Sequence, residues 1–327
     1  MKLTEQWYRN KTEEIQKMMA RNKLEALLLL DNFNIYYASG FFHQSTERPL
    51  GMQIPKQGKP SLFVPKLEKE MAEDTWIDDI HVYFDFPGPQ HPIIWMLEHV
   101  DTKFIGVDNL SVRDWNMVHR YFPTVQITDL VYTMRLVKDE DEIALLDKAG
   151  IYADYLVEKT REAIIEGLNE IEAYNYARDA TVNRMKSELD ELIMPNLGLT
   201  NGAVLYGPHS AHPHGLMGYR KPQKGDVIEA GFGALVCTYE SESEHTFIYG
   251  EPDTQTLDYF NAMYGAWEAG MKAAKPGVTC ASVNEASLNV IREAGYEQYL
   301  RHRMGHGKGL EEHEAPWIEE GEYTILA

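Results

Sequence analysis

Cysteine is scarce in this chain, which has only Cys237 and Cys280 among its 327 residues. Two cysteines have neither the number nor the spacing of a disulfide framework, a cysteine-based zinc site or a redox pair. The apolar run of residues 27–30 is far too short to cross a bilayer, and no longer run occurs. Residues 1–20 predict a polar helix rather than a secretory signal. We therefore expect a cytoplasmic protein.

Positively charged residues are also few relative to negatively charged ones. The 31 Lys and Arg residues are outnumbered by 51 Asp and Glu residues, which gives a formal net charge of −20. Binding to nucleic acid depends largely on cationic side chains that neutralise phosphates, so no nucleic acid partner is expected. Anionic membrane surfaces are disfavoured for the same reason. What remains is an ordinary globular composition, and the length suggests two domains.

The pattern of apolar residues changes near residue 132. Residues 1–132 alternate short apolar runs with helical periodicity, which predicts a small α/β domain. The runs that predict its strands are residues 24–30, 60–64, 81–86, 104–107 and 125–127. Residues 133–327 predict an α+β domain in which helices segregate on one side of an antiparallel sheet.

Helix signals are clear in the second domain. Asp139 and Glu142 form a capping-box pattern at the start of one helix. Further helices are predicted over residues 170–189, 254–274 and 282–294. The helix over 254–274 is expected to face inward with Leu257, Phe260, Tyr264, Trp267 and Met271. Residues 203–250 predict antiparallel strands with a hairpin turn near Gly233.

Two histidines stand in the glycine-rich segment of residues 301–317. Glycines on both sides of His306 let the backbone approach its surroundings closely, and His313 begins His-Glu-Ala-Pro seven residues later. This arrangement differs from the helical zinc signature. Spacing alone leaves two interpretations open, a surface turn or a pair of histidines held for chemistry.

Three more histidines, His209, His212 and His214, fall within residues 206–215. Neutral imidazoles could bind a metal ion or shuttle a proton next to a substrate. The two prolines of this segment also suit a loop or sheet edge with solvated histidines. The residues alone leave both interpretations open.

Acidic residues recur inside the apolar strands of residues 225–252. Glu242 and Glu244 stand two apart and so project to the same face of one strand, as do Glu229 and Gly231 on the other. Carboxylates in such strands are costly unless something pairs with them. The alternative is an edge strand that faces solvent.

Together these segments resemble the pita-bread hydrolases, which include aminopeptidase P, prolidase, methionine aminopeptidase and creatinase. Residues 34–41 look like the N-terminal signature of the aminopeptidase P and creatinase branch, and residues 135–149 look like the helix that opens its catalytic domain. Residues 305–307 (Gly-His-Gly) followed by residues 313–316 (His-Glu-Ala-Pro) are similar to the family's most specific motif. The resemblance implies a pita-bread catalytic domain preceded by a ribonuclease H-like α/β domain.

The resemblance also implies a metal site. Family peptidases hold two divalent ions with two aspartates, one histidine and two glutamates, and the ions activate water and polarise the scissile carbonyl. His306 matches the ligand histidine, His313 the substrate-side histidine, and His214 the histidine that contacts substrate or intermediate. Substrate contacts are further expected from His209, His212 and His245. Manganese, cobalt, iron and zinc would all suit such ligands.

The ligand set departs from the family pattern. Glu242 stands where the second aspartate is expected, and His245 replaces the usual arginine. A gapless alignment puts Gly231 at the first aspartate, and Glu229 reaches that position only if the hairpin holds extra residues. The family continues past Ala327 through two strands that carry its two glutamate ligands. Either the protein continues as well, or it lacks half of the metal site. We expect it to continue, because loss of the closing strands would leave unpaired sheet edges.

These features predict a hydrolase that cuts a peptide or amide-like C–N bond. In the leading interpretation it is an Xaa-Pro peptidase, with His306, Glu242 and Glu229 on the metal and His214 and His313 stabilising the intermediate. A homodimer acting on small peptides is expected by resemblance.

Two alternatives stay open. A creatinase-like enzyme would need no metal, because His214 would act as general acid and base while Glu244 anchors a small cationic substrate. The third interpretation is a pita-bread module that has lost catalysis and binds another protein.

Overall fold

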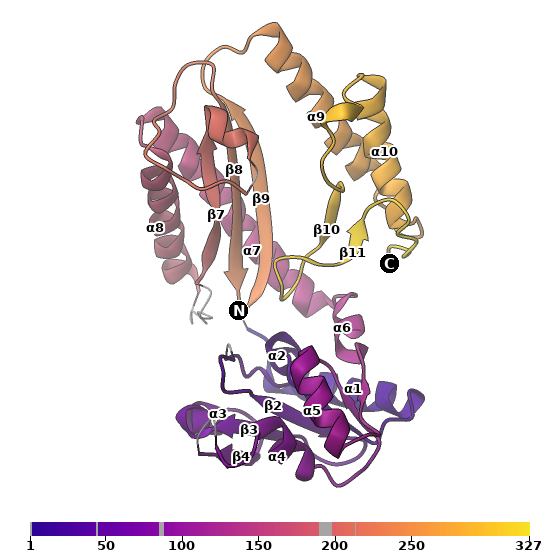
Figure 1. The fold of residues 1–327 in the computed structure, drawn as a ribbon. Helices are drawn as coiled ribbons and strands as arrows, with labels where there is room; N and C mark the ends of the chain where they lie inside the picture. The colour runs from indigo at the N-terminus through magenta and orange to yellow at the C-terminus, as the bar shows by residue number, and fades with distance from the viewer. Residues whose placement is uncertain (1, 44, 85–87, 190–197, 213) are drawn as a thin grey trace. The chain divides into compact units, whose positions relative to one another are not determined.

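The computed structural model describes residues 2–43, 45–84, 88–189, 198–212 and 214–327 (Figure 1). The chain divides into two compact units, residues 2–135 and residues 136–327, and each has its own sheet. Among the described residues, we find no helix with both the length and the apolar character needed to cross a membrane.

The N-terminal unit is built on a six-stranded sheet with the order β4-β3-β2-β1-β5-β6. Its strands are β1 (Ala26–Leu29), β2 (Gly51–Pro55), β3 (Ser61–Pro65), β4 (Asp79–Tyr83), β5 (Ile105–Val107) and β6 (Gln126–Ile127). β2 pairs antiparallel with both β1 and β3, whereas β1–β5, β3–β4 and β5–β6 are parallel pairs. The predicted α/β class of this unit is confirmed.

Helices surround this sheet and complete its core. They are α1 (Glu5–Arg21), α2 (Asn32–Ser39), α3 (Lys69–Glu73), α4 (Pro92–Glu98), α5 (Val112–Tyr121) and α6 (Leu130–Arg135), with the 3₁₀ turn η1 (Lys66–Glu68). The core joins strand residues such as Leu28, Phe63 and Val107 to Met96 of α4 and Val118 of α5. Burial of these apolar side chains stabilises the unit.

The apolar runs of the sequence overlap β1, β3, β4, β5 and β6. Residues 85 and 86 of the predicted run 81–86 lie outside the described residues. β2 was not predicted, because its sequence Gly-Met-Gln-Ile-Pro carries residues that strands disfavour. It forms because β1 and β3 pair with it on both sides.

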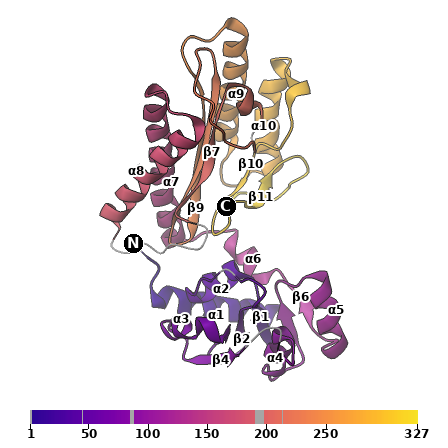
Figure 2. The same ribbon diagram turned by 60° about the vertical axis from the view of Figure 1, so that its left-hand side comes forward.

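The C-terminal unit has a three-stranded antiparallel sheet in the order β7-β8-β9. The strands are β7 (Thr200–Tyr206), β8 (Val227–Val236) and β9 (Tyr239–Ile248), and the helices that pack against them are α7 (Glu140–Ile165) and α8 (Glu170–Glu188). Figures 1 and 2 show both helices along one side of the sheet. The predicted α+β class of this unit is confirmed.

The rest of the unit is a helical pair followed by a small hairpin. α9 (Thr254–Ala273) and α10 (Cys280–Glu293) pack against each other, and the hairpin is formed by β10 (Gly305–Gly307) and β11 (Glu314–Ile318). Short 3₁₀ turns follow β7 and α10, namely η2 (Gly207–Ala211) and η3 (Glu297–Tyr299). In Figure 1 the hairpin lies between the sheet and the α9–α10 pair.

The inward face predicted for α9 is wrong in the described structure. Leu257, Tyr264 and Trp267 are 43%, 48% and 58% exposed. The buried residues of α9 are the small ones, Ala266 and Gly270. A Cβ at Gly270 would lie against the Ser287 hydroxyl of α10, so the two helices approach each other closely at this glycine.

The predicted turn near Gly233 is also wrong. The hairpin turn lies at Cys237 and Thr238, whose φ angles of 50° and 70° match the left-handed conformation of two-residue hairpin turns. Gly233 instead lies inside β8, opposite Glu242. A Cβ there would lie against the side-chain oxygens of Asn201 and Glu240, so this glycine makes room for these two side chains and forms no turn.

Candidate active site

Strand β9 presents a row of carboxylates. Glu240, Glu242 and Glu244 share one face, because side chains alternate along a strand. The other face packs on α7, where the hydroxyl of Ser241 donates to the carbonyl of Leu146 at 2.8 Å. The glutamates therefore project away from α7.

The hairpin of β10 and β11 supplies two histidines. His306 lies in β10, and His313 directly precedes β11. The strands pair antiparallel with a register shift just after His306. A side chain at Gly307 would lie 2.6 Å from the carbonyl oxygen of Ala315, so this glycine permits the close approach expected from the Gly-His-Gly motif. The two imidazole centroids are 4.0 Å apart.

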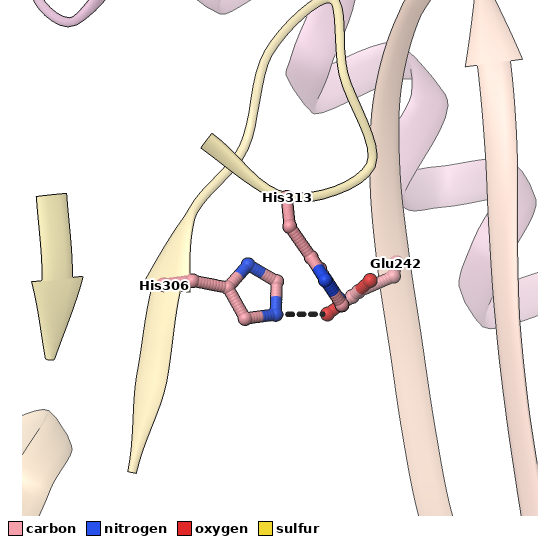
Figure 3. Close-up of side chains that lie close together, drawn as sticks. All are labelled: Glu242, His306 and His313. Carbon is pink, nitrogen blue, oxygen red and sulfur yellow. Dashed lines mark ion pairs between the residues drawn. The ribbon is translucent and has the colours of Figure 1, made fainter. Parts of the chain in front are cut away.

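Glu242, His306 and His313 converge on one point (Figure 3). Nε2 of His306 lies 3.3 Å from Oε1 of Glu242, which is the ion pair drawn as a dashed line. Nδ1 of His306 bonds to the carbonyl oxygen of Gly307 at 3.0 Å, which orients the ring so that Nε2 points to the carboxylate. One donor atom from each of the three side chains lies within 4.8 Å of the other two.

Electrostatics favour an ionised carboxylate in this cluster. The hydrogen bond with Glu242 raises the pKa of His306, although burial opposes the shift. Burial alone would raise the pKa of Glu242, but hydrogen bonds from His306 and Lys308 outweigh it and lower the pKa to about 2. Burial, followed by the charge of His306, lowers the pKa of His313. The site thus favours the ionised form of Glu242 and the protonated form of His306, and it favours the neutral form of His313.

These donors fit one divalent ion. Carboxylate oxygen and imidazole nitrogen are ligands that zinc and its neighbours accept. Ligand atoms bound to one ion at about 2.0 to 2.2 Å lie roughly 3 to 3.5 Å apart, and the His306–Glu242 separation of 3.3 Å agrees. Among the described residues a second three-donor group, Glu240, Glu242 and Glu312, shares Glu242 with the first.

Two glutamates fill the space beside Gly231. A side chain at Gly231 would start 2.8 Å from Oε1 of Glu229 and 3.0 Å from Oε1 of Glu244. Burial, followed by the charge of Glu244, raises the pKa of Glu229 to about 7. Burial, followed by the charge of Glu242, raises the pKa of Glu244. Neither Glu229 nor Glu244 belongs to a three-donor group within the described parts of the chain.

The histidine-rich segment after β7 is anchored by a buried carboxylate. Glu170, the first residue of α8, lies 2.8 Å from Nδ1 of His209. The same carboxylate accepts the backbone N–H groups of Tyr206 and Gly218 at 2.7 and 2.6 Å. His209 is thus held with its ring oriented, and Glu170 is a residue that sequence reasoning missed.

The other predicted substrate contacts are not members of the described three-donor groups. His212 and His214 are exposed and share no described donor group with Glu242. His245 lies on the same face of β9 as Ser241, which is the face turned to α7. Strand alternation therefore separates His245 from Glu242.

Lys308 and Glu240 are further site residues that the sequence did not single out. Nζ of Lys308 lies 2.7 Å from Oε2 of Glu242 and 3.4 Å from Oε1 of Glu240. Glu240 is 4% exposed and also accepts the side-chain amide of Asn201 at 3.1 Å. The available signals were the position of Glu240 two residues before Glu242 and a lysine inside a glycine-rich motif.

Two adjoining clefts of about 570 and 600 Å³ lie between η2 and α9. Both are lined by Ser210, Ala211, Tyr259 and Met263. They border the histidine-rich segment, while Glu242, His306 and His313 are not among their lining residues.

Known families match both units. Residues 144–327 match the model of metallopeptidase family M24, and residues 11–137 match that of the creatinase/prolidase N-terminal domain. An uncharacterized peptidase of Staphylococcus epidermidis is 29% identical over 308 residues, which cover 93% of this chain and 84% of the relative. An uncharacterized peptidase of Staphylococcus aureus is 28% identical with the same coverage.

Solved structures of prolidases and a dipeptidase have the same fold as this chain. The prolidase from Pyrococcus horikoshii OT3 is 26% identical, with a TM-score of 0.82 over 97% of this chain and 87% of that chain. The prolidase from Pyrococcus furiosus is also 26% identical, with a TM-score of 0.76 over 95% of this chain and 88% of that chain. An Xaa-Pro dipeptidase from Bacillus anthracis shares the fold, with 23% identity and a TM-score of 0.79 over 98% and 87% of the two chains. The chain therefore belongs to metallopeptidase family M24 and is a hydrolytic enzyme with a pita-bread fold.

Proposed function

We propose that this enzyme hydrolyses the peptide bond that precedes proline in short peptides. Two Pyrococcus proteins that it resembles are prolidases, and the Bacillus anthracis protein is an Xaa-Pro dipeptidase. The observation that carries the proposal is the convergence of Glu242, His306 and His313 from three separate segments. Metal-assisted hydrolysis of an amide needs such a group of oxygen and nitrogen donors.

Glu242 and His306 would hold a divalent ion, either manganese, cobalt, iron or zinc, with the imidazole of His313 beside it on the substrate side. When bound, such an ion polarises the scissile carbonyl and lowers the pKa of a water molecule. The family resemblance implies a second ion, whose site the described donors of this chain do not complete. Gly231 brings no side chain, and the carboxylates beside it lie outside the described three-donor groups.

The remaining roles belong to the chain's own side chains. The carbonyl of Gly307 orients the ring of His306, so that Nε2 stays directed at Glu242. His313 is kept neutral by burial and by His306, so it can donate a hydrogen bond to the oxyanion of the tetrahedral intermediate. His214 is proposed to contact the substrate from the exposed segment after η2, flanked by His209 and His212.

Hydrolysis of dipeptides tests this proposal. We expect cleavage of alanyl-proline but not of alanyl-alanine, loss of activity with chelator, and recovery with Mn²⁺. His306→Ala and His214→Ala should each lower kcat by about 100-fold or more, as the loss of a catalytic side chain does. The matched control is His119→Ala, which changes an exposed histidine of the N-terminal unit and should keep full activity. Full activity in His306→Ala would contradict the site assignment.

A second candidate function is metal-independent hydrolysis of a small cationic substrate. It is favoured by the carboxylates of Glu229 and Glu244, which lie together beside Gly231 and would attract a cation. Glu244 would anchor the substrate, and His214 would act as general acid and base. Cleavage of a cationic amide that survives chelator would favour this function over the first.

We also propose a homodimer, on the family resemblance alone. Light scattering should then give twice the 37.5 kDa mass of the chain. We also propose a cytoplasmic location, because two cysteines in 327 residues do not make a disulfide framework.

A further inference from the structure

Lys308 is enclosed by carboxylates. Its ammonium lies between Oε2 of Glu242 at 2.7 Å and Oε1 of Glu240 at 3.4 Å. The lysine side chain is 17% exposed, and that of Glu240 is 5% exposed. Such enclosed charges are stable only when they are paired, since burial removes most of their hydration. The ammonium therefore compensates the negative charge of two neighbouring glutamates.

The backbone around Lys308 is held in place. The carbonyl of Gly309 accepts the N–H of Glu240 at 2.8 Å, which joins this loop to β9. A side chain at Gly307 would meet the carbonyl of Ala315, and one at Gly309 would collide with the carboxylate of Glu314. Because the chain on both sides of Lys308 is packed so closely, the lysine is directed at β9.

Both carboxylate oxygens of Glu242 are thus engaged. Oε1 lies 3.3 Å from Nε2 of His306, and Oε2 lies 2.7 Å from Nζ of Lys308. A divalent ion bound by Glu242 would share this carboxylate with an ammonium, and two cations so close together repel each other.

We propose that the ammonium of Lys308 is a built-in counter-cation for Glu242 that competes with a divalent metal ion for this carboxylate. The inference rests on the metal site of the proposed function, and it identifies Lys308 as the residue that sets the affinity of that site. Removal of the ammonium should leave Glu242 free to coordinate.

The test measures metal binding rather than hydrolysis. Mn²⁺ is titrated by calorimetry into the full chain and into its Lys308→Met variant, and bound manganese is counted by elemental analysis after dialysis. Lys308→Met is expected to bind Mn²⁺ about tenfold or more tightly than the parent chain, because no ammonium competes for Glu242. One ion per chain should be recovered.

Three variants control the result. Lys275→Met removes an exposed lysine beyond α9 and should leave the Mn²⁺ affinity unchanged, which excludes a general effect of net charge. Lys308→Arg keeps the cation and should also bind like the parent chain. Lys308→Gln, which removes the charge but stays polar, replaces Lys308→Met if that variant fails to fold.

Equal Mn²⁺ affinities for the parent chain and the folded neutral variant would overturn the proposal, as would no detectable Mn²⁺ binding in any variant. Failure of the proposed function is a separate result. If the Lys308 variant binds Mn²⁺ more tightly but the protein does not cleave alanyl-proline, the role of Lys308 stands and the proposed peptidase activity is wrong.

Discussion

At the scale of single residues, Glu229 lies in surroundings that disfavour its ionised form. Its Oε2 is buried without a hydrogen-bond partner, and its other oxygen lies beside the position where a Gly231 side chain would begin. Burial and the charge of the neighbouring Glu244 raise its pKa to about 7, well above the usual value for a glutamate. At physiological pH the Glu229 carboxyl must therefore either bind a proton or keep a buried negative charge.

Glu229→Gln should stabilise the protein at pH 8 much more than at pH 5. The pKa is higher in the folded chain, so the folded chain binds more protons and the free energy of unfolding falls as the pH rises from 4.5 to about 7. Glutamine cannot ionise, so the gain at pH 8 is expected to reach up to about 3 kcal/mol. Urea denaturation at both pH values measures this. Exposed Glu166 provides the control variant Glu166→Gln, and equal gains at both pH values would contradict the argument.

At the scale of elements, the first turn of α7 is joined to strand β9 by a side-chain hydrogen bond. The side chain of Asp139 accepts the N–H of Glu142, and the Glu142 carboxylate accepts the N–H of Asp139, both at 3.0 Å. Glu142 also accepts the hydroxyl of Tyr239, the first residue of β9, at 2.9 Å. The helix cap therefore helps to position the strand that carries Glu242.

Glu142→Ala should cost more stability than Asp139→Ala. Loss of the N-cap residue is expected to lower the free energy of unfolding by about 1 kcal/mol. Loss of Glu142 also removes the acceptor of the Tyr239 hydroxyl, so about 2 to 3 kcal/mol is expected. Thermal denaturation of both variants measures the difference, with Asp253→Ala at the N-terminus of α9 as a second N-cap for comparison. Equal losses for Glu142→Ala and Asp139→Ala would show that the link to β9 contributes nothing.

Helices were predictable from sequence because their end signals are local. The capping box at Asp139 and Glu142 forms as predicted, and α8 and α10 begin and end within two residues of their predicted bounds. β2 could not be predicted in this way, because it depends on partners that are distant in sequence. The wrong prediction for α9 has the same cause. Apolar periodicity shows that a helix has an apolar face, but it does not show which segment covers that face.

At the scale of the whole molecule, the net charge of −20 opposes folding through self-repulsion. Salt screens this repulsion, so Tm at pH 7.5 is expected to rise by a few degrees when NaCl is increased from roughly 10 to 150 mM. The sequence pI is about 5.0, and near that pH the same increment should have little effect. Differential scanning calorimetry at both pH values measures the shift. A Tm that falls with salt at pH 7.5 would mean that attractive ion pairs outweigh the repulsion.

The sequence by itself determined the family, the fold class of both units and the residues Glu242, His306 and His313 as members of one motif set. These depend on short spacings, strand alternation and caps, which act between neighbours in the chain. Only the tertiary structure decided that Lys308 reaches Glu242 and that Glu244 occupies the space beside Gly231. Such contacts join segments far apart in sequence, and packing selects them through the register of β8 and β9 and the path of the β10–β11 hairpin.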